Sequence, residues 1–280
     1  LSRRRMDLVE SHVHIWTVRD PRYARHPDSD TQPDIEAAPD ELFRAQDEIG
    51  GVRWTVLIQP RYYLWDNTYL AQAAVDYPDR FVVAGRVDPR VPGAAARLRE
   101  LMQWPGYRGI RLAPNTDLTV RWLDDRDQDA LWAEAAATEA TIGLLIARAQ
   151  LPQAAEMATR HPDVTIVIDH LGSPDYSEPS SIENLLRLAD FPGVHVKLSG
   201  YPGGTGEGYP YRTAHTLIER VYRAFGADRV MWGTDWPVCL SRATYREAFE
   251  SAWNLPFLSD EDRQWIFNGT ARKAWRINSK

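Results

Sequence analysis

Residues 8–15 read LVESHVHI, a short strand-like run that carries two histidines, His12 and His14, one residue apart. Side chains two residues apart on a β-strand point to the same side, so we expect both imidazoles to converge on one point. Val9 and Val13 are expected on the opposite, apolar face, as in a strand that is covered by helices. The histidine pair therefore indicates a metal or substrate site, although a hydrogen-bonded surface pair has the same spacing.

Seven further short runs of apolar and β-branched residues follow along the chain, at 52–58, 81–87, 107–112, 142–147, 164–169, 194–199 and 229–234. A turn signal or a polar residue ends each run, and helix-like stretches such as Asp124–Ala140 separate them. Eight strand–helix units in about 250 residues predict an α/β protein, a (β/α)₈ TIM-type barrel formed by residues 1–280 as a single domain. An open, doubly wound sheet is the alternative, but it needs a glycine-rich phosphate turn after the first strand, which HVHIWTVRD lacks.

The connections predict which end of the barrel carries the chemistry. The 24-residue stretch from Trp16 to Pro39 is expected to be a long loop after the first strand, and such loops usually serve the active site. Residues 203–208 (GGTGEG) predict a flexible loop or a lid after the seventh strand. Residues 1–6, which include three consecutive arginines, are expected to form a disordered tail.

Composition excludes several classes of protein. A net charge of −6 gives no support for nucleic-acid binding. The single cysteine, Cys239, excludes an intramolecular disulfide and fits a reducing compartment. The longest apolar runs are far too short to span a bilayer. We therefore expect a soluble cytoplasmic protein that acts on a small molecule, with neither a nucleic acid nor a membrane as its partner.

Barrel enzymes carry their chemistry at the carboxyl ends of the strands. The polar residues predicted there are His12, His14, Gln59, Arg61, Arg86, Asp88, Arg111, Arg148, His170, Lys197, Ser199 and Asp235. Three histidines and one aspartate are the ligands that a single Zn²⁺ or Mn²⁺ ion takes, and such an ion lowers the pKa of water to about 7. Asp235 would then accept the proton as general base.

Each of these residues also has a structural interpretation. His170 could cap the helix that follows it, and Asp235 could be a helix N-cap. Asp169, next to His170, should point the other way and could at most support it from behind. Only the joint placement of His12, His14, His170 and Asp235 at the ends of three strands favours an active site.

The motifs resemble those of the amidohydrolase superfamily, in its lactonase branch, over nearly the whole chain. The resemblance rests on VESHVHIW (9–16), RFVVAGRVDP (80–89), YRGIRL (107–112), the DHLG (169–172) and KLSG (197–200) segments, GTDWPV (233–238) and NGTARKAWRI (268–277). It implies a distorted (β/α)₈ barrel that hydrolyses a lactone of an anionic sugar acid or of an aromatic-degradation intermediate. His12, His14, His170 and Asp235 match the active-site positions of the family, with Asp235 as the residue that activates water.

The resemblance leaves two questions open. The segments GIRLAP and LLIARAQL lack the bridging lysine or glutamate and the extra histidine of two-metal members, so one divalent ion, zinc or manganese, is expected. Other members work without metal, with histidines and an arginine polarising the carbonyl. A metal-dependent, non-oxidative decarboxylase of an aromatic acid is the alternative activity. It would need an acid after the first strand, and only Glu10 could substitute.

Several cations are predicted around the same mouth, which indicates an anionic substrate. The residues expected to contact it are Arg61, Arg111, Arg148, Lys197, Ser199, Tyr201 and Trp236. A structural ring of ion pairs is the competing interpretation of the charges. Aromatic residues on these loops could likewise stack on a planar substrate ring or serve packing alone.

Overall fold

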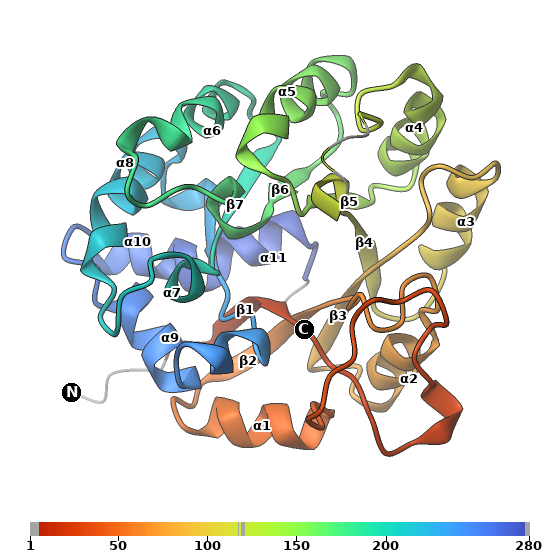
Figure 1. Cartoon of the computed structure of the whole chain (residues 1–280), viewed down its shortest axis with the longest axis horizontal. Helices are drawn as coiled ribbons and strands as arrows, with labels where there is room; N and C mark the ends of the chain where they lie inside the picture. Colours follow the sequence, from red (N-terminus) through yellow and green to blue (C-terminus); the bar gives the residue numbers. More distant parts are fainter. Residues whose placement is uncertain (1–5, 117, 119–120, 278–280) are drawn as a thin grey trace.

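A computed structural model describes residues 6–116, 118 and 121–277, and its eight parallel strands confirm the predicted (β/α)₈ barrel. They are ordered β1 to β8 around a single sheet, in the middle of Figure 1. The strands are β1 (Leu8–Val13), β2 (Val52–Ile58), β3 (Phe81–Gly85), β4 (Tyr107–Leu112), β5 (Thr141–Leu144), β6 (Ile166–Ile168), β7 (Val194–Leu198) and β8 (Val230–Trp232). Residues 1–5 of the predicted tail lie outside the described part of the chain.

Helices surround these strands, as Figure 1 shows. They are α1 (Pro39–Asp47), α2 (Thr68–Asp76), α3 (Ala94–Leu101), α4 (Asp129–Ala137), α5 (Leu151–Arg160), α6 (Glu183–Arg187), α7 (Tyr201–Gly204), α8 (His215–Phe225), α9 (Tyr245–Trp253), α10 (Asp260–Gln264) and α11 (Thr270–Ala274). Part of the predicted 203–208 loop belongs to α7, which corrects that expectation. Within the described residues, no helix has the length and apolar composition of a membrane span.

The barrel interior is packed rather than hollow, and α11 closes its amino-terminal end. Trp275, which follows α11, belongs to the same buried cluster as the inward residues Val56 and Met231. Thr141, at the start of β5, donates a hydrogen bond to the carbonyl of Ala274 at 2.5 Å. Because this end is sealed by the chain itself, a small molecule has to enter from the carboxyl ends of the strands.

The seam between β1 and β8 is the irregular part of the barrel. These two strands share no regular ladder, and an isolated bridge joins Val13 to Trp236 beyond the end of β8. Two backbone bonds hold the seam, from the amide of His14 to Trp236 at 2.8 Å and from the amide of Asp235 to His12 at 3.0 Å. The same seam therefore closes the barrel and positions the predicted catalytic residues.

An irregularity within β1 changes which side chains face inward. Its register with β2 shifts between Glu10 and Val13, so the alternation of β1 is interrupted there. Val9 consequently lies in the inner cluster, whereas Val13 lies in the outer core, which corrects the expectation that they share a face. Glu10 points outward, where Tyr245 donates to it at 2.5 Å and Gln46 at 3.1 Å.

The stability of the barrel should depend on pH through Glu10. Burial raises the pKa of Glu10 to about 7, against the opposing hydrogen bonds of Thr234, Tyr245 and Gln46. The folded-state pKa of Glu10 lies above its value in the unfolded chain. The contribution of Glu10 to the free energy of unfolding is therefore fully present below about pH 4.5 and is lost as pH rises through 7. At roughly 1.4 kcal/mol per pKa unit, the loss is about 3 kcal/mol.

Urea unfolding at pH 4.5, 6 and 8, in the presence of a chelator, measures this dependence. Glu10→Gln is expected to flatten the profile because its amide does not titrate. Asp163→Asn, an exposed carboxylate, serves as the control and should leave the profile unchanged. Equal slopes in the wild type and Glu10→Gln would contradict the prediction.

Candidate active site

The predicted ligands His12, His14 and Asp235 meet at the β1–β8 seam. Nε2 of His12 lies 3.3 Å from Nε2 of His14, and the Oδ1 atom of Asp235 lies 3.4 and 3.5 Å from these two atoms. Gly233 permits this approach, since a Cβ atom there would lie 2.8 Å from Cβ of His12. Asp235 follows with a φ of 64°, which turns its carboxylate toward the histidines.

His170 joins the cluster by a turn of the backbone rather than by strand alternation. It follows β6 in the short helix η5 (Asp169–Gly172) and has a φ of 51°. Its Nε2 atom lies 3.9 Å from Oδ2 of Asp235, and its Nδ1 atom lies 2.9 Å from Oγ of Ser199. Gly200 packs against the same ring, since a Cβ atom there would lie 2.7 Å from Nδ1 of His170. The KLSG and DHLG segments thus meet at one imidazole.

Removing the Ser199 hydroxyl should loosen His170. In Ser199→Ala, we expect kcat or metal affinity to fall by about 10- to 100-fold, since the ring loses the group that orients it. Metal content and steady-state kinetics measure the effect. The matched control is Ser251→Ala, which removes a buried hydroxyl that bonds Tyr201 at 2.5 Å, away from the histidines. Equal activity of the two variants would contradict a positioning role for Ser199.

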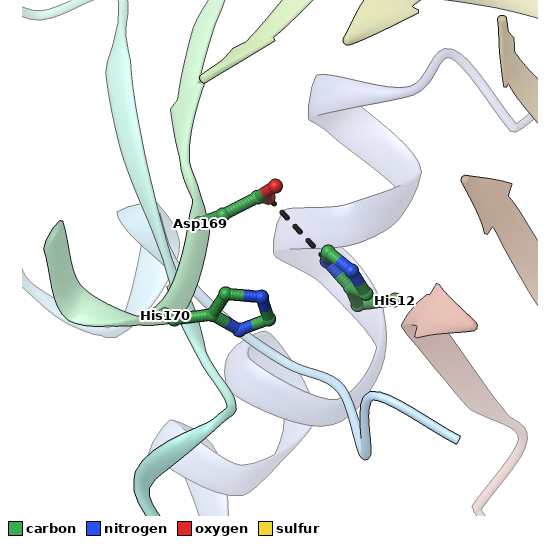
Figure 2. Close-up of side chains that lie close together, drawn as sticks. All are labelled: His12, Asp169 and His170. Atoms are coloured by element: carbon green, nitrogen blue, oxygen red, sulfur yellow. Dashed lines mark ion pairs between the residues drawn. The ribbon is translucent and has the colours of Figure 1, made fainter. Parts of the chain in front are cut away.

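Asp169 also faces this site, contrary to the expectation that it points away. The alternation of β6 brings Val167 and then Asp169 inward. Figure 2 shows its carboxylate directed toward His12. The Oδ1 atom of Asp169 lies 3.4 Å from Nδ1 of His12. The same carboxylate accepts a hydrogen bond from Nε of Arg111 at 2.8 Å and lies 3.0 Å from Nζ of Lys197. Asp169 therefore neutralises two buried cations beneath the histidines.

Protonation in the cluster suits metal binding. Burial, and secondarily Lys197, hold the pKa of His12 well below its usual range, so this ring is neutral. Burial also lowers the pKa of His170. Burial alone would raise the pKa of Asp235, but the neighbouring histidines, His170 foremost, lower it below the ordinary value. At neutral pH, His12 and His170 are therefore neutral imidazoles and Asp235 is a carboxylate.

The geometry fits one divalent ion. Nδ1 of His14 lies 2.7 Å from the carbonyl oxygen of Ile58 and donates to it, which leaves Nε2 as a free lone pair. Nδ1 of His12 can donate to Asp169, and Nε2 is then equally free, or it can accept from Lys197 at 3.0 Å. In the first tautomer, these nitrogens and Asp235 form a converging donor set of the kind that zinc prefers.

A cavity of about 350 Å³ opens next to this cluster. Its lining comes from the ends of β2, β3 and β4 and from the long loop after β1, and includes Asp28, Asp30, Arg61, Trp65, Arg86, Asp88, Arg90, Arg111, Thr116 and Trp122. Arg111 belongs to both regions, because it lines the cavity and donates to Asp169 below the histidines. Arg111 therefore connects the wall of the cavity to the carboxylate beneath the histidines.

Comparison with known proteins agrees with this arrangement. The family model described as amidohydrolase matches residues 9–277. This chain belongs to the amidohydrolase family. It is 30% identical over 238 residues to an L-fucono-1,5-lactonase of Burkholderia ambifaria, with 81% of each chain covered. It is also 25% identical to a 2-pyrone-4,6-dicarboxylate hydrolase of Comamonas testosteroni, over 82% of this chain and 76% of that one.

Solved structures give the same result. An amidohydrolase from Burkholderia multivorans with bound zinc superimposes with a TM-score of 0.85 at 25% identity, covering 97% of this chain and 99% of that one. A dihydroxybenzoic acid decarboxylase from Polaromonas, with bound manganese, has a TM-score of 0.74 at 15% identity, covering 98% of each chain. The second likeness shows a shared fold alone.

Four residues predicted to contact substrate do not line the cavity of this amidohydrolase. Arg148 is exposed, with its guanidinium 4.0 Å from Asp175. Tyr201 is buried and bonds Ser251. Lys197 is buried next to His12, and Trp236 is buried in the β1–β8 seam. Lys197 lies within β7, and the turns after β7 and β8 direct Tyr201 and Trp236 into packing, whereas Arg148 points into solvent. Ser199 contacts His170, as described above.

Two predicted residues do line the cavity, and a third joins them. Arg61 is partly exposed and pairs with Asp30, whereas Arg111 is buried. Arg86 is the third, a residue expected at the mouth but not chosen as a substrate contact. Its preference for the cavity follows from β3, which ends at Gly85 and directs the next side chain inward.

Proposed function

We propose that the protein hydrolyses a lactone, with His12, His14, His170 and Asp235 holding one divalent ion. The observation that carries this is the convergence of two Nε2 atoms and one carboxylate oxygen within 3.3–3.5 Å, beside an accessible cavity. Relatives named for lactone hydrolysis, and a zinc-bound solved structure, support the same activity. A bound zinc or manganese ion would supply positive charge at the lactone carbonyl and acidify water.

The residues of the chain then have distinct tasks. Asp235 is ionised and accepts a proton from the attacking water, whose oxygen forms the new bond to the carbonyl carbon. The bond from that carbon to the ring oxygen breaks, and Asp235 returns the proton to this oxygen, so the product is a hydroxy acid. His170, held by Ser199, faces Asp235 throughout. Arg111 is held by Asp169 at the edge of the cavity.

The decarboxylase alternative lacks its expected carboxylate. Glu10 points away from the histidines, toward Thr234, Tyr245 and Gln46. No other acid of β1 faces the cluster in the structure. The geometry therefore favours hydrolysis, and the decarboxylase becomes a measurable outcome of the test.

The test combines elemental analysis of protein purified without a histidine tag with turnover of a lactone panel, with and without chelator. About one equivalent of zinc or manganese and chelator-sensitive hydrolysis are the expected results. Full hydrolysis without metal would mean that the histidines and an arginine polarise the carbonyl directly. Inert lactones together with CO₂ release from an aromatic acid would overturn the proposal in favour of the decarboxylase.

A further inference from the structure

Arg86 is a buried cation without a hydrogen-bond partner for two of its side-chain nitrogens. The residue is 4% exposed, and neither Nε nor Nη1 has a partner among the residues that the structure describes. A buried charge that lacks a partner is costly, so native proteins rarely keep one without a purpose. Burial first, and then the neighbouring cations Arg111 and Arg61, lower its pKa to about 9. It remains protonated at neutral pH.

The position of Arg86 is fixed by its surroundings. Asn67 accepts from its backbone amide at 2.9 Å and donates to its carbonyl oxygen at 2.9 Å. The guanidinium lies over the ring of Trp65, with its central carbon 5.1 Å from the ring centre. Both side chains line the cavity of about 350 Å³. These contacts therefore fix the guanidinium of Arg86 at the wall of the cavity before any ligand binds.

Two of the three acids that line the cavity already pair with other cations. Asp30 pairs with Arg61, and Asp88 lies 3.4 Å from Nε of Arg90. The remaining acid, Asp28, lies at the rim, 4.0 Å from His26. None of these carboxylates forms an ion pair with Arg86 within the described part of the chain. A bound anion would supply the partner that Nε and Nη1 of Arg86 lack among the residues that the structure describes.

Arg86 shares the cavity with Arg111, which is anchored through Asp169 to the histidine cluster. A lactone whose carbonyl reaches the cluster would place a ring substituent toward Arg86. Arginine side chains bind carboxylates through charge-assisted hydrogen bonds, and Trp65 and Trp122 offer apolar surface for a ring. The volume suits one small ring and its substituents.

Resting on the lactonase function, we propose that Arg86 and Trp65 form a subsite for a carboxylate carried by the lactone. The substrate class is thus a small cyclic ester with an additional carboxylate, rather than an uncharged sugar lactone. Arg86 determines specificity here, whereas the hydrolytic step belongs to the cluster around Asp235.

The test compares Arg86→Met with the wild type on two lactones, 2-pyrone-4,6-dicarboxylate and the uncharged L-fucono-1,5-lactone. We expect KM for the dicarboxylate to rise at least about tenfold, with kcat/KM for the uncharged lactone changed by less than about threefold. The matched control is Arg61→Met, which removes a partly exposed cation of the same cavity that already pairs with Asp30. It should change KM less than Arg86→Met does.

A direct binding measurement separates this subsite from the catalytic proposal. Isophthalate, a planar dicarboxylate without an ester, should bind the metal-loaded wild type and bind Arg86→Met at least tenfold more weakly by calorimetry. This result holds even if every lactone proves inert, which would overturn the lactonase function alone. Hydrolysis of the uncharged lactone only, or equal isophthalate binding by both proteins, would overturn the subsite.

Thermal unfolding distinguishes a binding role from a structural one. A structural cation leaves its partners unsatisfied when it is removed, and Tm falls. A subsite cation without partners destabilises the empty protein, so Tm of Arg86→Met should be unchanged or higher. Arg86→Gln provides a second, polar variant with the same expected loss of dicarboxylate binding. A lower Tm in both variants, with unaltered isophthalate affinity, would count against the proposal.

Discussion

Asp235→Asn should lower kcat by about 10³-fold or more while the barrel stays folded. Among the described residues, Asp235 provides the carboxylate that lies within 3.5 Å of Nε2 of both His12 and His14, and its low pKa keeps it ionised as a proton acceptor. Asparagine has the same shape and cannot accept that proton. It also tolerates the left-handed backbone at this position, where φ is 64°, so the loss should not come from strain.

Steady-state kinetics on the best lactone, with metal content and circular dichroism of the same preparation, measure the effect. Asp88→Asn is the matched control, because this carboxylate lines the cavity but pairs with Arg90. Its kcat should stay within about tenfold of the wild type. A similar kcat for Asp235→Asn and Asp88→Asn would remove Asp235 from the proton transfer.

Asp169→Asn should reduce the free energy of unfolding by about 3–5 kcal/mol, as expected when one member of a buried ion pair is lost. Lys197 is fully buried, with Nζ 3.0 Å from Asp169, and Arg111 donates to the other carboxylate oxygen at 2.8 Å. The variant would leave two buried like charges without their shared anion. The side-chain amide of the Asp169→Asn variant would also offer Lys197 one acceptor oxygen, whereas the carboxylate of Asp169 has two.

Urea unfolding with chelator present measures this loss. Burial already lowers the pKa of Lys197 to about 8, and Asp169 opposes that effect. Without the carboxylate the folded-state pKa should fall further below the unfolded value, so Asp169→Asn should regain stability as pH rises toward 9. Adding Lys197→Met should make the double variant less destabilised than the sum of the single changes. The control Asp175→Asn, at an exposed pair, should cost less than about 1 kcal/mol. Strictly additive losses would show that the two groups are not coupled.

The architecture could be predicted because each strand has its own apolar run and each run is followed by a turn. All eight observed strands fall within or overlap the predicted runs. His12 and His14 could be placed for a similar reason, since their alternation survives beyond the irregularity of β1. Asp235 follows from its position after the last strand, which lies beside the first in a closed barrel.

The remaining errors arise where alternation stops applying. The register shift in β1 reverses Val9 and Glu10 relative to the simple pattern. At the end of β6, strand alternation brings Asp169 inward. The left-handed backbone of His170 then turns the His170 side chain inward as well. Strand alternation alone predicts that only one of two consecutive residues faces inward, so it cannot predict that both Asp169 and His170 do. Two adjacent polar residues before a glycine, as in DHLG, are the signal that could have predicted such a turn.

The cations were harder to assign because a strand end does not define where a long side chain goes. Arg86 and Arg148 both follow apolar runs, yet one lies in the cavity wall and the other in solvent. The difference lies in local contacts, since Asn67 holds the backbone of Arg86 while Arg148 begins the short helix η4 (Arg148–Gln150). Such contacts connect residues far apart in sequence, so composition and spacing do not contain them.

The candidate active site lies at the β1–β8 seam, where the first and last strands of the barrel meet. Backbone bonds at His14 and Asp235 join the two ends of the sheet, and the side chains that would hold an ion come from both ends. Metal occupancy would therefore restrain local opening of the barrel as well as serve chemistry. Amide hydrogen exchange at His14 and Asp235 should slow when zinc is added, while exchange at the β4–β5 ladder stays constant.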